Sequence, residues 1–228
     1  MSPSDGDKFV VVAIDGPAAS GKSSTAEWVA RELGFCHVDS GALYRAATAA
    51  ALRTGLPPEE WTPTAVLDAA RIVSLAAEGT TLAPLLDGAP ADDEIRSAAV
   101  TNAVPRVARM QSVRSWVNEQ VRRVATERNV VADGRDIGTA VFPDANVKIY
   151  LVADPWERAK RRLVQHLKRL PTDEEIAAET DRLVHRDAAD TTQLVQARDA
   201  VLIDTTHLMQ SEQVARIVAL AKAATRSN

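Results

Sequence analysis

The sequence contains a single cysteine, Cys36, among its 228 residues, which rules out an internal disulfide bond. Cysteine usage this low is typical of proteins that fold in a reducing compartment. The chain also lacks an excess of positive charge. Its formal net charge is −4, so it offers no broad basic surface to a nucleic-acid duplex. Local arginines could still bind a small anionic ligand.

Long hydrophobic runs are missing as well. A run such as residues 9–14 is far too short to cross a membrane. The acidic, polar start of the sequence, MSPSDGDK, lacks the basic and then apolar pattern of a secretory signal. We therefore expect a cytoplasmic protein that binds neither membranes nor nucleic acid. We also expect it to act as a monomer, although the composition does not bear on this.

Short β-branched runs recur along the chain and alternate with helical segments. They are FVVVAI (9–14), FCHV (35–38), NVVA (129–132), VKIYLVA (147–153) and AVLI (200–203). Continuous apolar runs of this length are typical of strands that are buried on both faces of a parallel sheet. Residues 23–33 carry alanine, valine and leucine at helical spacing, which predicts a strand–helix–strand unit at the start of the chain.

Two regions depart from this alternation. Residues 55–96 are rich in proline, alanine and acidic side chains and contain a turn signal, LLDGAP, at 85–90. We expect an inserted subdomain there, with a helix near 63–77 and a small hairpin. Residues 155–198 are helical, dense in charge and rich in arginine, which fits a mobile cover and equally fits a solvated pair of surface helices.

One stretch carries the strongest chemical signal. Gly16-Pro17-Ala18-Ala19-Ser20-Gly21-Lys22-Ser23 matches the pattern G-x-x-x-x-G-K-[ST], and Ser24 follows it. Small side chains let backbone N–H groups approach a phosphate, and a helix beginning near Lys22 adds unpaired donors at its positive end. Lys22 can then reach the β and γ phosphates, and the Ser23 hydroxyl can hold Mg²⁺. The flanking strand and helix argue against a mere glycine-rich turn, so we expect binding of a nucleoside triphosphate with Mg²⁺.

The second predicted strand ends in VDSGALYRAA (38–47). Asp39 and Ser40 therefore lie at the carboxyl end of a strand, where ligands bind in open α/β sheets. Ser40 could equally be an ordinary helix N-cap. Tyr44 and Arg45 follow in the predicted first turn of a helix. A cation is unfavourable there, so Arg45 either opposes an anion or faces solvent.

A helix predicted over 105–127 places an arginine among apolar residues. Its three- and four-spaced stripe consists of Val107, Met110, Val117, Val121 and Val124. Arg114 falls inside this stripe. Because an unpaired charge on a buried face is costly, we expect Arg114 to meet an anion, either an acidic side chain or a bound phosphate.

The third strand of the predicted core ends in VVADGRDIGTAVFPDA (130–145). It places Asp133, Arg135 and Asp136 within four residues of one another. They could be solvated charges around an Asp-Gly turn. They could instead bind ribose hydroxyls, Mg²⁺-bound water and phosphate.

Six stretches together resemble the bacterial cytidylate kinase family of nucleoside-monophosphate kinases. They are IDGPAASGKSS, VDSGALYRA, DDEIRSAAVTNAV, VVADGRDIGTAVFPDANVKIYLVAD, ERAKRRL and AVLIDTT, and DGRDIGTAVFPDA is the most specific. The resemblance implies a three-layer α/β P-loop kinase fold with a five-stranded parallel sheet. Its core would be 1–54, 97–154 and 199–228, with a monophosphate-binding insert at 55–96 and a helical lid at 155–198. It also implies transfer of the γ-phosphoryl group of ATP to CMP or dCMP.

The resemblance further implies roles for single residues. For the acceptor, Arg114 and Arg45 would hold the phosphate, Ser40 and Asp136 the sugar, and Asp39, Tyr44, Asp133, Arg135, Arg186 and Asp190 would complete the site. Arg158 and Arg162 would face ATP. Lys22, Arg135 and Arg186 would neutralise charge on the moving phosphoryl group.

Two positions depart from the family pattern. Pro105 stands where a serine commonly contacts the cytosine, and Gln193 stands where the lid commonly carries an arginine. The segment that leads to Asp199 is also short, which would draw Arg198 toward the site when the lid closes. We therefore expect Arg198 to supply the missing catalytic guanidinium.

Two other interpretations stay open. The protein could be a P-loop kinase for another small acceptor, or a nucleotide-dependent switch or degenerate binding protein without transfer activity. The arginine-rich acceptor side and the absence of an N/T-K-x-D guanine signature argue against a switch.

Overall fold

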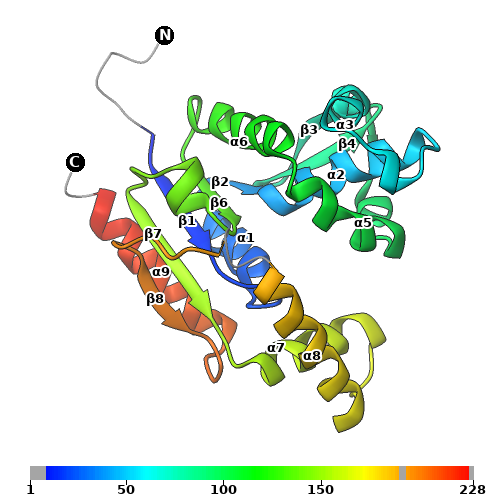
Figure 1. The fold of residues 1–228 in the computed structure, drawn as a ribbon. Coiled ribbons are helices and arrows are strands. Elements are labelled where there is room, and N and C mark those ends of the chain that lie inside the picture. Colours follow the sequence, from blue (N-terminus) through cyan, green and yellow to red (C-terminus); the bar gives the residue numbers. More distant parts are fainter. Residues whose placement is uncertain (1–8, 190–193, 226–228) are drawn as a thin grey trace.

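The structure is a computed structural model that describes residues 9–189 and 194–225. Within these ranges a sheet of eight strands runs in the order β3-β4-β2-β6-β1-β7-β8, and β5 pairs with β4. Figure 1 shows the strands with helices packed around them. Across the same ranges, none of the helices is long and apolar enough to span a bilayer.

Five strands form the parallel core of the sheet. They are β1 (Val11–Asp15), β2 (Cys36–Asp39), β6 (Val130–Gly134), β7 (Val147–Val152) and β8 (Val201–Asp204). Each pairs in parallel with its neighbour, and β1 lies between β6 and β7. The five strands predicted from the apolar runs are therefore confirmed, and their carboxyl ends meet at one edge.

Alternate residues of the core strands face two different helix layers. Val12 and Ile14 pack against α1 (Lys22–Leu33) and α9 (Gln210–Thr225). Ala13 lies in a second cluster, with side chains of α2 (Ser40–Arg53) and α6 (Gln111–Ala125). Because side chains alternate along a strand, burial on both faces requires such a continuous apolar run. The three-layer α/β architecture is confirmed.

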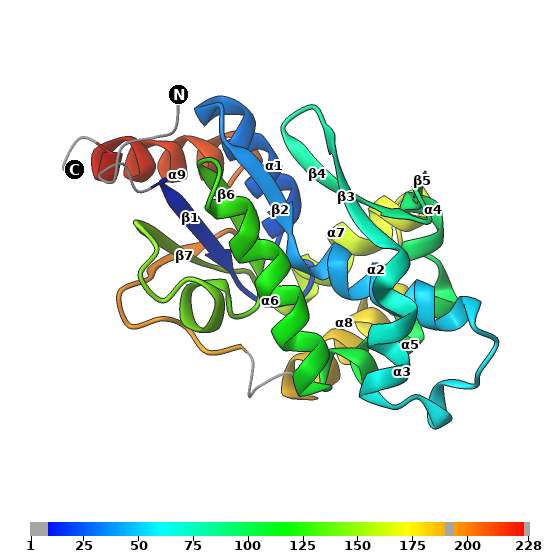
Figure 2. The same ribbon diagram turned by 90° about the horizontal axis from the view of Figure 1, so that it is seen from above.

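The inserted region adds the remaining strands to the sheet. It consists of η1 (Pro58–Glu60), α3 (Pro63–Ala69), η2 (Ala70–Ile72), β3 (Val73–Glu78), β4 (Thr81–Leu86), β5 (Ala89–Pro90) and α4 (Asp92–Ile95). The hairpin β3–β4 joins the core sheet because β4 pairs in parallel with β2, and Figure 2 shows it on the side of β2 away from β7. The predicted hairpin is present, and it lengthens the expected five-stranded sheet.

The helix predicted near 63–77 is wrong in its second half. Thr62 caps α3 and Pro63 suits its first turn, but the helical conformation ends with η2. Gly79, with a φ of 61°, then turns the chain. Residues 73–78 pair one by one with residues 81–86. The ladder of hydrogen bonds to β4 overrides the local helical preference of this alanine-rich stretch.

The helix predicted over 105–127 is two helices. The first, α5, spans Ala98–Ala108 and includes Pro105, and the second is α6. Met110 has an extended backbone, with φ −77° and ψ 110°, and this separates them. The buried stripe of α6 is Val113, Val117 and Val121, so Arg114 lies beside the stripe rather than inside it.

Two helices of the 155–198 region dock beside the carboxyl edge of the sheet. They are α7 (Pro155–Leu167) and α8 (Asp173–Ala189), and Figure 1 shows β7 pointing toward α7. Ala159, Ile176 and Leu183 form a small apolar cluster with Ala18 of the glycine-rich loop. The two helices are therefore packed on the loop and are not a pair exposed to solvent all round.

A matched pair of leucines tests the packing of the sheet. Leu151 in β7 is fully buried, and Leu202 in the neighbouring strand β8 is 55% exposed. We expect Leu151→Ala to lower the free energy of unfolding by about 3 kcal/mol or more, because it leaves a cavity between two layers. Leu202→Ala should cost less than about 1 kcal/mol. Urea denaturation measures both, and equal losses would contradict the burial of the Leu151 face of β7.

Candidate active site

The glycine-rich loop leaves the carboxyl end of β1 and enters α1. Gly16 has a φ of 149°, and a Cβ there would collide with the carbonyl oxygen of Leu151. Gly21 is the N-cap of α1, in the left-handed conformation with a φ of 90°. Since Gly21 has no side chain to accept the first N–H groups of α1, these donors remain available to a phosphate.

Two side chains of the loop are already oriented. The ammonium of Lys22 donates to the carbonyl of Pro17 at 2.7 Å. Burial lowers the pKa of Lys22 to about 8, and the nearby charge of Arg135 adds to this shift. The hydroxyl of Ser23 donates to a carboxylate oxygen of Asp133 at 2.7 Å. The hydroxyl of Ser20 is buried, with no hydrogen-bond partner among the described residues.

Asp133, near the end of β6, connects three segments of the site. Its carboxylate accepts from Ser23 and lies 2.8 Å from Nε2 of His37 in β2. Its backbone carbonyl accepts from the Ser40 hydroxyl at 2.9 Å. Burial alone would lower the pKa of His37, but the hydrogen bond and the charge of Asp133 outweigh it, and the net shift is upward.

His37 was missed from the sequence because FCHV was interpreted as an apolar strand. Its other ring nitrogen, Nδ1, lies 3.2 Å from the hydroxyl of Thr81 in β4. A histidine inside a buried strand needs polar partners. Its presence in FCHV could therefore have indicated a polar network at this strand.

A cleft of about 230 Å³ opens beside the loop at the carboxyl edge. The predicted site residues that line it are Ala18, Ala19, Lys22, Ser23, Asp39, Ser40, Tyr44, Arg45, Arg114, Asp133, Arg135, Asp136, Arg162 and Arg186. They come from the loop, from α2, from α6, from the end of β6 and from the docked helices. The structure thus brings most of the predicted site residues into one cleft, although some of them lie more than a hundred positions apart in the sequence. We call this the acceptor cleft, after the role that the sequence predicts for most of these residues.

Arg45 belongs to a cluster of positive charge in the acceptor cleft. Its guanidinium donates to the hydroxyl of Thr101 at 3.0 Å and to the carbonyl of Ile95 at 3.4 Å, so it does not simply face solvent. Burial lowers the pKa of Arg45. Asp39 opposes this shift, and the charges of three further arginines, Arg162, Arg96 and Arg135, add to it. Mutual repulsion of this kind favours an anion among them.

Arg96 is a second residue that the sequence did not assign. It lies just after α4, in the EIR segment, and lines the acceptor cleft. Arg45 itself lies in the second turn of α2 and not in the first, since α2 begins at Ser40. The helix dipole therefore explains less about Arg45 than its neighbouring charges do.

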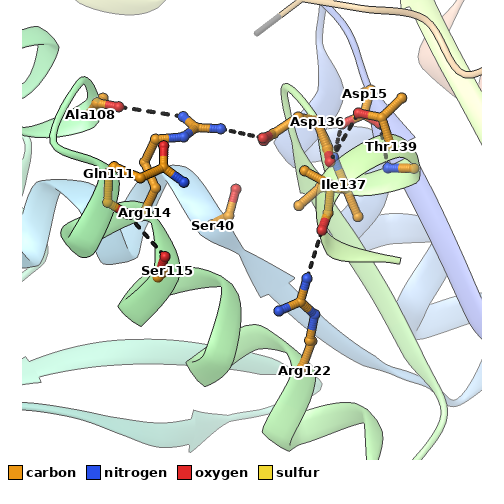
Figure 3. Close-up of polar contacts among 12 residues, drawn as sticks. Asp15, Ser40, Ala108, Gln111, Arg114, Ser115, Arg122, Asp136, Ile137 and Thr139 are labelled. Carbon is orange, nitrogen blue, oxygen red and sulfur yellow. Dashed lines mark hydrogen bonds and ion pairs between the residues drawn. The ribbon is translucent and has the colours of Figure 1, made fainter. Parts of the chain in front are cut away.

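Arg114 meets an acidic side chain. Its guanidinium binds the carboxylate of Asp136 and donates to the carbonyl of Ala108 at 3.4 Å, as Figure 3 shows. The nearby hydroxyl of Tyr44 is buried with no partner among the described residues, and burial raises the pKa of Tyr44 to about 12. This end of the cleft therefore offers a paired donor and acceptor beside an unsatisfied hydroxyl.

Asp39, and not Ser40, caps α2. Its carboxylate accepts from the Ala42 N–H at 3.1 Å. Burial, together with the neighbouring charge of Asp133, raises the pKa of Asp39 to about 6. Ser40 is the first residue of the helix, and its hydroxyl is held by the backbone of β6. The N-cap alternative for Ser40 is therefore wrong.

A second cleft, of about 420 Å³, opens on the other side of the loop. We call it the donor cleft, after the ATP-binding role that the sequence predicts for Gly21 and Ser24 in its lining. It shares five lining residues with the acceptor cleft: Ala19, Lys22, Ser23, Arg96 and Arg162. Gly21, Ser24 and Gln213 also line it. A phosphate chain on the loop would therefore have its end at the junction of the two clefts.

The docked helices place their arginines differently. Arg162 lies at the junction and is held by Glu179 at 2.9 Å. Arg158 is buried, donates to the carbonyl of Ala18 at 3.0 Å and pairs with Asp187 at 2.7 Å. In this structure the charge of Arg158 holds α7 and α8 on the loop, and its predicted contact with ATP stays a prediction.

The structure does not bring Arg198 to either cleft. Arg198 is exposed, and its neighbour Asp199 binds the buried ammonium of Lys148 in β7 at 2.8 Å. This ion pair holds the segment near the amino end of β8, away from the loop. The role predicted for Arg198 as the lid arginine finds no support in this arrangement. Asp190 and Gln193 lie outside the described residues.

The phosphate-binding loop consists of small residues and lies at the junction of two clefts lined by lysine and arginine. This arrangement defines a P-loop phosphotransferase. The sequence matches the family model for cytidylate kinase over residues 12–223. It is 41% identical over 233 residues to a cytidylate kinase of Pelotomaculum thermopropionicum, covering 96% of this chain and 98% of that protein. It is 38% identical over 214 residues to a cytidylate kinase of Chlorobaculum tepidum, covering 91% and 90%. The chain belongs to the cytidylate kinase family.

The lysine at the junction can be tested alone. We expect Lys22→Ala to lower kcat by about 10²–10³-fold or more, since it removes a preorganised cation from the developing charge. The fold should persist, because the Lys22 ammonium bonds to a single loop carbonyl. Lys222→Ala, an exposed change on α9, is the control. A Lys22→Ala variant with near-normal kcat would remove the loop from the mechanism.

Proposed function

We propose that this protein transfers the γ-phosphoryl group of ATP to CMP or dCMP, giving ADP and CDP or dCDP. The observation that carries the proposal is the meeting of two clefts at Lys22 and Ser23. Membership in the cytidylate kinase family supports the choice of acceptor. The protein is accordingly an enzyme, a nucleoside-monophosphate kinase.

The described side chains suit a reaction that depends on charge and position. Phosphoryl transfer requires the attacking and leaving oxygens in line, with cations around the moving group. Lys22, Arg96 and Arg162 line the junction, where that group would pass. Arg135 and Arg186 approach from the acceptor cleft. No general base is needed, because an acceptor phosphate oxygen is already ionised.

The residues present also fit Mg²⁺. The hydroxyl of Ser23 and a carboxylate oxygen of Asp133 lie 2.7 Å apart beside the loop, and both are oxygen ligands of the kind that Mg²⁺ prefers. Ser23, with Asp133, would hold the ion. When bound there, Mg²⁺ supplies neutralisation of phosphate charge. The bond from Ser23 keeps both oxygens oriented in advance.

The acceptor nucleotide is proposed to lie with its phosphate among Arg45, Arg96 and Arg135 and its base near Arg114 and Asp136. The resemblance alone assigned Arg114 to the phosphate and Asp136 to the sugar. The ion pair of Arg114 with Asp136 supports the base instead, because that pair presents one donor and one acceptor side by side.

Cytosine suits the Arg114–Asp136 pair. Its amino group donates and its adjacent ring nitrogen accepts, whereas uracil reverses both groups. Val104, Pro105 and Ala108 form an apolar wall of the same cleft. Since Pro105 has no side-chain hydrogen-bonding group, discrimination between bases falls on Arg114 and Asp136.

The two appended regions are proposed to act as a monophosphate-binding insert, 55–96, and a lid, 155–198. The lid carries Arg162 and Arg186 to the acceptor cleft. Closure of such a cover over both nucleotides would exclude water, which otherwise hydrolyses ATP.

An assay over a panel of nucleoside monophosphates tests the proposed function. CMP and dCMP should be the best acceptors, ahead of UMP, and AMP and GMP should be poor. Initial rates of ADP formation with each acceptor give kcat/KM. Efficient phosphorylation of AMP would reveal a purine-sized site and reject this acceptor. Binding of ATP and CMP without any transfer would favour a degenerate binding protein.

A single substitution tests the placement of the acceptor. Arg114→Met should raise KM for CMP about tenfold or more, because a charged hydrogen-bond donor is lost from the acceptor site. KM for ATP should hardly change. The control is Arg123→Met on the same helix, where the arginine side chain is 64% exposed. Equal effects on both nucleotides, or on neither, would make Arg114 a structural residue.

A further inference from the structure

A short π-helical turn, η3 (Ile137–Val141), begins directly after Asp136. Its closing hydrogen bond runs from the N–H of Phe142 to the carbonyl of Ile137 at 2.7 Å. Isolated π turns are rare and persist where neighbouring groups hold them, often at functional sites. Two charged side chains from other elements hold this one.

The first is Asp15, the last residue of β1, which is 4% exposed. Its two carboxylate oxygens accept from the backbone N–H groups of Ile137, at 2.8 Å, and Gly138, at 2.7 Å (Figure 3). Burial raises the pKa of Asp15 to about 6, and the two N–H donors act against this rise by stabilising the charge. The start of η3 is therefore tied to the residue that directly precedes the glycine-rich loop.

The second is Arg122 of α6. Its guanidinium donates to the carbonyl of Val141 at 2.9 Å and to the carbonyl of Ala140 at 2.6 Å. Arg114, which binds Asp136, lies eight residues earlier on the same helix, and that spacing places the two arginines on one face. One face of α6 therefore contacts both ends of the turn, as Figure 3 shows.

We propose that Asp15 and Arg122 are positioning residues that fix the Asp136 carboxylate in the acceptor cleft by holding the two ends of η3. Asp15 also links the phosphate-binding loop to this turn, so one carboxylate sets the spacing between the donor and acceptor sides. The inference rests on the proposed function, because it assumes that Asp136 contacts the acceptor nucleotide.

Arg122 is the better of the two for a test. It is exposed, so its replacement leaves no buried charge and the fold should tolerate it. Asp15 is buried beside the loop, where a change would disturb ATP binding as well. Arg123, the adjacent residue, is exposed and pairs with Glu119 one turn away, which makes Arg123→Gln a matched control.

The experiment measures KM for CMP, KM for ATP and kcat for Arg122→Gln, with CMP affinity by calorimetry as a readout that needs no turnover. We expect KM and Kd for CMP to rise about fivefold or more, since carbonyls that hold the turn lose a charged donor. KM for ATP should stay within about twofold, as should every constant of Arg123→Gln. Arg122→Lys should restore part of the affinity, because an ammonium can still bond one carbonyl.

A double-mutant cycle with Asp136→Asn then tests whether Arg122 acts through Asp136. The effect of Arg122→Gln on CMP affinity should shrink once Asp136 is already changed. In an enzyme that is otherwise active, fully additive effects of the two substitutions on CMP affinity overturn the inference. It is also overturned if Arg122→Gln lowers the free energy of unfolding without changing CMP affinity. A wild-type protein that neither binds nor phosphorylates CMP overturns the proposed function, and the inference with it.

Discussion

The carboxylate of Asp133 is the interaction on which the site depends. It stands at the carboxyl end of β6, between β2 and β1, and it holds the hydroxyl of Ser23 on one side and the ring of His37 on the other. These bonds join β6, β2 and the first turn of α1 at the edge where the clefts open. His37 extends the connection to the hairpin through Thr81, so the inserted region is bonded to the same network.

Positive charge is concentrated around this network at an energetic cost. Burial lowers the pKa of Lys22 to about 8, and the charge of Arg135 adds to that shift. Burial lowers the pKa of Arg45, and the charges of the arginines near it lower it as well. A nucleotide phosphate placed among these cations would reduce their mutual repulsion. The repulsion present without a ligand therefore favours binding of the anion. Protein carboxylates such as Asp39 offset only part of it, since burial raises the pKa of Asp39 itself to about 6.

The docked helices α7 and α8 contribute arginines to the site, and ion pairs between the two helices hold them together. Arg158 bonds Ala18 and Asp187 and lines neither cleft, whereas Arg162 is held by Glu179 and lines both clefts. The two arginines are four residues apart on one helix and differ because only Arg162 reaches the junction. Spacing along α7 alone could not separate these roles.

The sequence by itself determined the five core strands and the phosphate-binding loop, because each is a local pattern: buried strands need continuous apolar runs, and the loop needs small residues from Gly16 to Gly21. It also placed Asp133 and Asp136 at a carboxyl edge. Only the tertiary structure decided which side chains bond to one another. It pairs Arg114 with Asp136 and Ser23 with Asp133, and it pairs Lys148 with Asp199, the residue next to Arg198. It likewise turned residues 73–78 into a strand through pairing with β4. Such contacts join distant residues, and their energies do not appear in any local pattern.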